Sequence, residues 1–214
     1  MFASGASSHG WALHIASARP HDHPPGGLRI RRQRLRWQSR LPVRESGMAL
    51  PRLILIAGIP SAGKTYFGDW LETNHGFLHI DDVSGNRLRL YGLHMAWEQS
   101  LLAHDAHPFI AELQNQNRPA ILNWSFPLDS LPFLALLKHS GLSLWWFDAD
   151  IKRARREHIR NGKDARAFDV QVADIAAHRV QIDTVFQPNM LQVLPARGER
   201  LPPEAIFEIM SRSA

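Results

Sequence analysis

The sequence contains no cysteine. This absence excludes disulfide bonds, thiolate zinc sites, iron–sulfur clusters and cysteine nucleophiles. Long hydrophobic runs are also missing, because no stretch approaches the about 20 apolar residues that a membrane helix needs. The sequence also has no apolar region followed by a cleavage site, which is the feature that would indicate secretion. We therefore expect a cytoplasmic protein that does not enter a membrane.

Acidic residues are scarce at the start of the chain. Residues 1–47 hold eight arginines and two acids, which gives this segment a net charge of +6. The formal net charge of the whole chain is +5, so residues 48–214 carry a net charge of −1. A basic chain suggests a nucleic-acid partner, but this part of the chain is close to neutral. Nucleic acid is therefore a partner that the charge does not favour.

The same segment, residues 1–47, shows no sustained periodicity, and its PPGG run at residues 24–27 argues against a helix there. Its composition fits a disordered arm or a targeting segment. A third interpretation is that Met48 is the true start, because a strand pattern begins almost at once after it. We favour the third, and predict a disordered arginine-rich segment over 1–47 and one folded domain over 48–214.

Short apolar runs alternate with helical patterns after residue 50, which predicts an α/β fold with a parallel sheet and helices on both faces. The first run, LILIA at residues 53–57, has the continuous apolar character of a strand buried on both faces. We expect five strands, at residues 53–57, 77–80, 120–124, 142–147 and 190–194. We expect helices at residues 65–73, 85–104, 108–116, 128–139, 151–161, 170–185 and 203–210.

The sequence GIPSAGKT at residues 58–65 matches the pattern G-x-x-x-x-G-K-[ST] in full. It follows a predicted buried strand and precedes a predicted helix, as this motif requires. Gly58 and Gly63 allow backbone conformations that other residues resist. The N–H groups of the loop, which includes Ser61 and Ala62, can then surround a phosphate.

The motif predicts a site for ATP and Mg²⁺. Lys64 supplies a positive charge to the β- and γ-phosphates, and Thr65 places its hydroxyl on Mg²⁺. The alternative is a plain strand–turn–helix with an incidental lysine, which the agreement of spacing and context disfavours.

At these residues the sequence resembles the small P-loop kinases, in the branch that contains polynucleotide kinase, zeta toxin, gluconate kinase and chloramphenicol phosphotransferase. The resemblance covers about residues 50–210 in layout and is specific only at the P-loop. It implies a P-loop NTPase three-layer sandwich with a five-stranded, mainly parallel sheet and a helical lid. It also implies transfer of the γ-phosphate of Mg·ATP to a hydroxyl of a small molecule or nucleotide end.

In that family an acid at the end of the second strand receives the acceptor hydroxyl. The sequence GFLHIDD at residues 76–82 has this form, so the resemblance makes Asp81 the candidate base and Asp82 its alternate. A carboxylate there could orient a hydroxyl and accept its proton. Alternatively, one of the pair caps the following segment. Asp81 is also a candidate magnesium ligand.

The resemblance further implies arginines on a lid after the fourth strand. Arg156 and Arg160 share one helical face and are the candidates to neutralise charge on the γ-phosphate. A solvated basic face is the alternative interpretation. Three other arginines lie in the same region and are more simply explained as surface residues: Arg153, Arg155 and Arg166. The FQP turn at residues 186–188 resembles a family turn near the nucleotide.

One departure from the common P-loop pattern stands at the third strand, AILNWS at residues 120–125, which has no acid at its end to help hold Mg²⁺. Asn123 or Ser125 could orient a magnesium-bound water, and Asp81 or Asp82 could support the metal instead. The departure also keeps open a nucleotide-binding module that transfers no phosphate. The acceptor is not identified by the sequence; its pocket is expected between residues 84 and 116.

Overall fold

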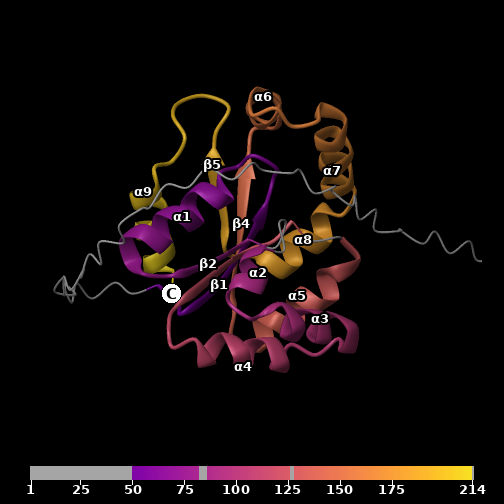
Figure 1. Cartoon of the computed structure of the whole chain (residues 1–214). Helices are drawn as coiled ribbons and strands as arrows, with labels where there is room; N and C mark the ends of the chain where they lie inside the picture. The colour runs from indigo at the N-terminus through magenta and orange to yellow at the C-terminus, as the bar shows by residue number, and fades with distance from the viewer. Residues whose placement is uncertain (1–49, 82–85, 126–127, 214) are drawn as a thin grey trace, which may run out of the picture. The chain divides into compact units, whose positions relative to one another are not determined.

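The computed structural model describes residues 50–81, 86–125 and 128–213 (Figure 1). The predicted segment 1–47 and the alternate base Asp82 lie outside the described residues. In the part of the chain that is described, no helix is both long enough and apolar enough to cross a membrane.

The described strands form one five-stranded sheet in the order β2-β3-β1-β4-β5, and every neighbouring pair is parallel. This arrangement confirms the predicted α/β fold class. The strands are β1 Leu53–Gly58, β2 Leu78–Asp81, β3 Ala120–Asn123, β4 Ser143–Ala149 and β5 Met190–Leu194. Each lies within two residues of its predicted position.

The helices also follow the predicted alternation with the strands. They are α1 Lys64–His75, α2 Asn86–Leu90, α3 His94–Ala103, α4 His107–Asn115, α5 Leu131–His139, α6 Ile151–Arg160, α7 Ala165–Ala177, α8 Arg179–Phe186 and α9 Pro203–Arg212, with a short 3-10 turn at Leu128–Ser130.

Two predicted helices were wrong as single elements. The pattern over 85–104 divides into α2 and α3, because Gly92 adopts a left-handed conformation (φ 72°) that ends the first of them. The pattern over 170–185 divides into α7 and α8 at His178. Helix α7 also begins earlier than predicted, since the Asp164 side chain accepts hydrogen bonds from the N–H groups of Arg166 and Ala167 and caps its start.

Helices cover both faces of the sheet, and two neighbouring residues of β4 show how. Phe147 packs against Phe67 of α1, with ring centroids 5.7 Å apart. Trp146, which points to the opposite face, packs against Phe186 of α8 at 5.3 Å. In Figure 1, α1 and α9 lie on one side of the sheet and α5 and α8 on the other. The domain therefore has three layers.

The sheet order places a switch point at the carboxyl end of β1. Strand β1 lies between β3 and β4, so the chain leaves it first toward β2 and β3 and later toward β4 and β5. Ligands of parallel α/β sheets bind at such a point, outside the carboxyl ends of the strands. The loop that follows β1 is the glycine-bearing motif.

Candidate functional site

The motif loop begins with a close approach between two strands. The N–H of Ile59 donates to the carbonyl oxygen of Phe147 at 3.0 Å. Gly58 has a φ of 140°, and a Cβ at this position would lie 2.1 Å from the same oxygen. Only glycine fits there, so the first glycine of the motif is explained by backbone packing as well as by conformation.

The loop then turns tightly into α1. The N–H of Ala62 donates to the Ile59 carbonyl at 3.1 Å, and Ser61 adopts a positive φ of 61°. Gly63 precedes the helix with a φ of 104°; no side chain caps α1 and no acid lies in its first turn. The first N–H groups of an α-helix have no partner within the helix. This helix start therefore offers N–H donors to an anion.

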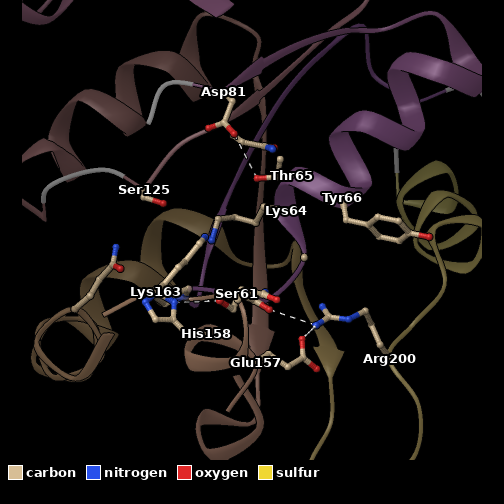
Figure 2. A pocket seen from close by; sticks show the side chains of 15 residues that line it. Ser61, Lys64, Thr65, Tyr66, Asp81, Ser125, Glu157, His158, Lys163 and Arg200 are labelled. Carbon is tan, nitrogen blue, oxygen red and sulfur yellow. Dashed lines mark hydrogen bonds and ion pairs between the residues drawn. The ribbon is translucent and has the colours of Figure 1, made fainter. Parts of the chain in front are cut away.

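Lys64 is buried, and its side chain bends back over the loop (Figure 2). Its ammonium group donates to the carbonyl oxygens of Gly58 and Ile59, each at 3.0 Å. These bonds hold the positive charge beside the start of α1, where the sequence predicts the β- and γ-phosphates.

Oxygen ligands meet on the far side of Lys64 (Figure 2). The Thr65 hydroxyl lies 3.4 Å from the Asp81 carboxylate, and Asn123 is in register with Asp81 across the sheet. Asn123 and Ser125 line the same cavity, and the Oδ1 atom of Asn123 is buried with no hydrogen-bond partner among the described residues. Hydroxyl, carboxylate and amide oxygens suit a hard cation, so the residues present fit Mg²⁺.

These groups line one cavity of about 720 Å³, a volume within the usual range for small-molecule sites. It contains the motif residues Ser61, Gly63, Lys64 and Thr65 together with Asp81, which the sequence predicted as neighbours. The other lining residues are Pro60, Tyr66, Asn123, Ser125, Glu157, His158, Asn161, Lys163, Gln171 and Arg200.

Helix α6 faces this cavity with a different side from the one predicted. Glu157 and His158 line the motif cavity, whereas Arg156 and Arg160 line a smaller cavity of about 360 Å³ with Arg153 and Glu157. The structure therefore does not bring Arg156 and Arg160 together with Lys64, and their action on a phosphate stays a prediction. No residue of the 186–188 turn lines either of these two cavities.

Arg200, in the connection between β5 and α9, contacts the motif loop but belongs to no recognisable motif. Its guanidinium donates to the carbonyl oxygens of Ser61 and Ala62 and forms an ion pair with Glu157 of α6. A Cβ on Gly63 would lie 2.6 Å from its Nη1 atom, so the second motif glycine leaves room for this side chain. Arg200 thus joins the loop to α6.

We expect Arg200→Ala to weaken Mg·ATP binding by about 10-fold, because the loop loses the donor that holds two of its carbonyl groups. Calorimetric titration of the full chain measures the change. Arg118→Ala is a matched control, since Arg118 also donates to backbone carbonyls, those of Gly76 and Phe77, but lines neither cavity. Equal losses in both variants would contradict a specific role for Arg200.

His158 contacts the loop from α6, with its Nδ1 atom 3.1 Å from the Ser61 hydroxyl. Burial holds the pKa of His158 below its ordinary value, and the charge of Lys163 adds to this, against a smaller opposing effect of Asp164. His158 is therefore neutral in the folded protein at neutral pH.

This lowered pKa predicts a pH dependence of stability. As the pH falls through the ordinary histidine value, the unfolded chain takes up a proton at residue 158 before the folded protein does, so the free energy of unfolding decreases. We expect His158→Gln to lose less stability than the wild type between about pH 7.5 and about pH 5.5. Urea unfolding at both pH values measures this, with His139→Gln, an exposed site on α5, as the control. A slope identical to that of the wild type would refute the assignment.

No family model matches the sequence, and no curated protein matches it. Among solved structures, a gluconokinase from Sinorhizobium meliloti 1021 is similar with a TM-score of 0.45 and 15% sequence identity, over 76% of this chain and 91% of that chain. A likeness this distant does not bear on function. The all-parallel sheet, with the glycine-bearing loop between β1 and α1, defines an α/β fold of the P-loop NTPase type.

Proposed function

We propose that this protein is an ATP-dependent phosphotransferase that moves the γ-phosphate of Mg·ATP to a hydroxyl of a small molecule or nucleotide end. The observation that carries the proposal is the meeting of a complete phosphate-binding loop with a carboxylate in one cavity. Lys64 and the start of α1 lie on one side of that cavity, and Asp81 lies beside Thr65.

Phosphate binding falls to the loop. The main-chain N–H groups around residues 61–65 bind the phosphate oxygens, and the Lys64 ammonium, already held at the loop, adds a positive charge without reorganisation. Thr65 and Asp81 would hold Mg²⁺, which would neutralise charge on the phosphates.

Proton transfer falls to Asp81. Its carboxylate stands at the end of β2, on the edge of the cavity, where an acceptor hydroxyl can approach the γ-phosphate. In this role Asp81 orients the hydroxyl and accepts its proton as the new oxygen–phosphorus bond forms, while the bond from the γ-phosphorus to the β–γ bridging oxygen breaks and ADP leaves.

The remaining requirement is to neutralise the negative charge on the transferred phosphoryl group. Lys163 and Arg200 already line the cavity. Arg156 and Arg160 line the neighbouring one, so we propose that they reach the γ-phosphate through a movement of α6 as a lid.

The direct test incubates the full chain with Mg²⁺ and ATP labelled at the γ-phosphate, and a panel of sugar acids, nucleosides, antibiotics and nucleic-acid ends. We expect labelled product on one acceptor class and slow release of phosphate to water in its absence. If calorimetry shows saturable binding of no nucleoside triphosphate at all, the proposal is refuted.

A second candidate function is an ATP-binding module that transfers no phosphate. It is favoured by one observation, the presence of Asn123 where an acid at the end of β3 would support Mg²⁺. Saturable ATP binding with no transfer to any acceptor of the panel would support this alternative over the first.

A further inference from the structure

A histidine is buried behind the cavity, between α1 and the sheet. His79 of β2 is fully buried, and it fits there because α1 has a glycine opposite it. A Cβ on Gly68 would lie 2.4 Å from the Nε2 atom of His79. Glycine at position 68 of α1 thus leaves the space that the imidazole occupies.

Both ring nitrogens of His79 have polar neighbours. Nδ1 lies 2.8 Å from the Asp69 carboxylate and 2.8 Å from Nη1 of Arg87, and Nε2 lies 2.6 Å from Nδ2 of Asn123. Asp69, Glu72 and His79 bring possible metal ligands within 4.8 Å of one another, but the Arg87 guanidinium contacts all three and already supplies a cation there. We therefore interpret this cluster as a hydrogen-bond network that holds His79 in place, not as a metal site.

The contacts select one tautomer. Nε2 faces the amide nitrogen of Asn123, which can only donate a hydrogen bond, so Nε2 carries no proton and the neutral ring has its single N–H on Nδ1. The Arg87 guanidinium has other acceptors in Asp69, Glu72 and the His79 carbonyl, and does not depend on Nδ1. The proton therefore lies on Nδ1 and is donated to Asp69. Nε2 is left as an acceptor for the amide group of Asn123.

This arrangement turns the other end of the amide away from the histidine. Oδ1 of Asn123 is then the buried acceptor without a partner among the described residues, and Asn123 lines the cavity that contains Thr65 and Asp81. A buried polar atom left without a bond is costly, so such an atom beside a ligand cavity points to a partner that arrives with the ligand.

We propose that His79 is a positioning residue: held by Asp69, it orients Asn123 so that Oδ1 accepts a hydrogen bond from a water bound to Mg²⁺. The inference rests on the proposed nucleotide site. Mg²⁺ keeps several of its waters in protein sites, so an uncharged acceptor at the end of β3 can support the ion without binding it directly. His79 and Asn123 together would replace the acid at the end of the third strand that helps to hold Mg²⁺ in many P-loop proteins.

The experiment compares the dissociation constants of ATP measured by calorimetry with excess EDTA and with Mg²⁺. Their ratio is the magnesium enhancement. We expect Asn123→Leu to lower this ratio by about 10-fold or more while metal-free ATP binding changes little, since the loss of a partner that orients a metal shell has this size of effect. Asn123→Asp, which offers only acceptors, is expected to keep or raise the ratio.

Two substitutions of the histidine form a matched pair. The amide oxygen of His79→Gln can reach the place of Nε2 and keep the bond to Asn123, whereas His79→Asn is too short to do so. We expect His79→Gln to keep most of the magnesium enhancement and His79→Asn to lose it. Thermal unfolding of each variant separates this effect from a loss of fold, which would lower both affinities together.

The tautomer is checked without ATP, by long-range ¹H–¹⁵N NMR of the histidine rings. We expect an unprotonated Nε2 in His79, and a proton on Nε2 overturns the proposal, because the amide of Asn123 would then present its donor to the cavity. Wild-type protein that binds Mg·ATP with an enhancement that Asn123→Leu leaves unchanged also overturns it. Wild-type protein that binds no ATP overturns the proposed function itself, a result distinct from both.

Discussion

Replacing Lys64 by alanine is expected to lower the affinity for Mg·ATP by about 30-fold or more and to bring phosphate transfer below detection. The Lys64 ammonium is buried and bonded to the loop carbonyls of Gly58 and Ile59, so its charge is held at the helix start. In the complex the Lys64 ammonium and the phosphate of ATP would form a buried charge pair. Removing one partner of such a pair costs at least about 2 kcal/mol, which corresponds to this change in affinity. Calorimetric titration and the labelled transfer assay measure the two effects.

The matched control for this variant is Lys152→Ala. Lys152 is an exposed lysine of α6 that lines neither cavity, and its removal changes the net charge equally. We expect it to keep the wild-type affinity. An affinity of Lys64→Ala within a few-fold of the wild type, at unchanged thermal stability, would mean that polyphosphate does not bind at the loop.

The second large effect is on stability. Gly58→Ala is expected to lower the free energy of unfolding by about 3 kcal/mol, and the Tm by roughly 6–12 °C, because the new Cβ meets the Phe147 carbonyl at 2.1 Å and the φ of 140° is unsuited to alanine. Strands β1 and β4 would have to separate where they are hydrogen bonded. Urea unfolding and thermal melts measure the loss.

Gly141→Ala separates the two causes. Gly141 also has a positive φ, 99°, but a Cβ there would meet nothing within 4 Å. We expect a loss of only about 1 kcal/mol from the backbone conformation alone. Losses of the same size at the two positions would show that the contact with the Phe147 carbonyl contributes nothing to the destabilisation.

The elements that local chemistry decides were predictable from the sequence. A strand buried on both faces must be apolar at every position, so β1 is visible as LILIA before the motif. Each α/β unit repeats this pattern, and the sheet follows from the repetition. The meeting of Lys64, Thr65 and Asp81 in one cavity also follows, because parallel strands end at the same edge of the sheet.

What depends on tertiary packing was not predictable. Periodicity groups Arg156 with Arg160 on one face of α6, but nothing local determines which face meets the phosphate loop, and in the structure Glu157 and His158 do so. Arg200 has no sequence signal, because its partners are backbone carbonyls of residues distant in the chain. The breaks at Gly92 and His178 lie inside patterns whose periodicity alone continues.

The bond network of Arg200 has a consequence for the order in which the domain becomes competent. The motif is complete in the chain by residue 65, yet the carbonyl groups of Ser61 and Ala62 accept hydrogen bonds from Arg200, a side chain that follows β5. During synthesis a nascent chain therefore carries every motif residue long before the loop is braced. If the protein binds ATP as proposed, we therefore expect the full affinity for nucleotide only once the segment after β5 has docked against the loop.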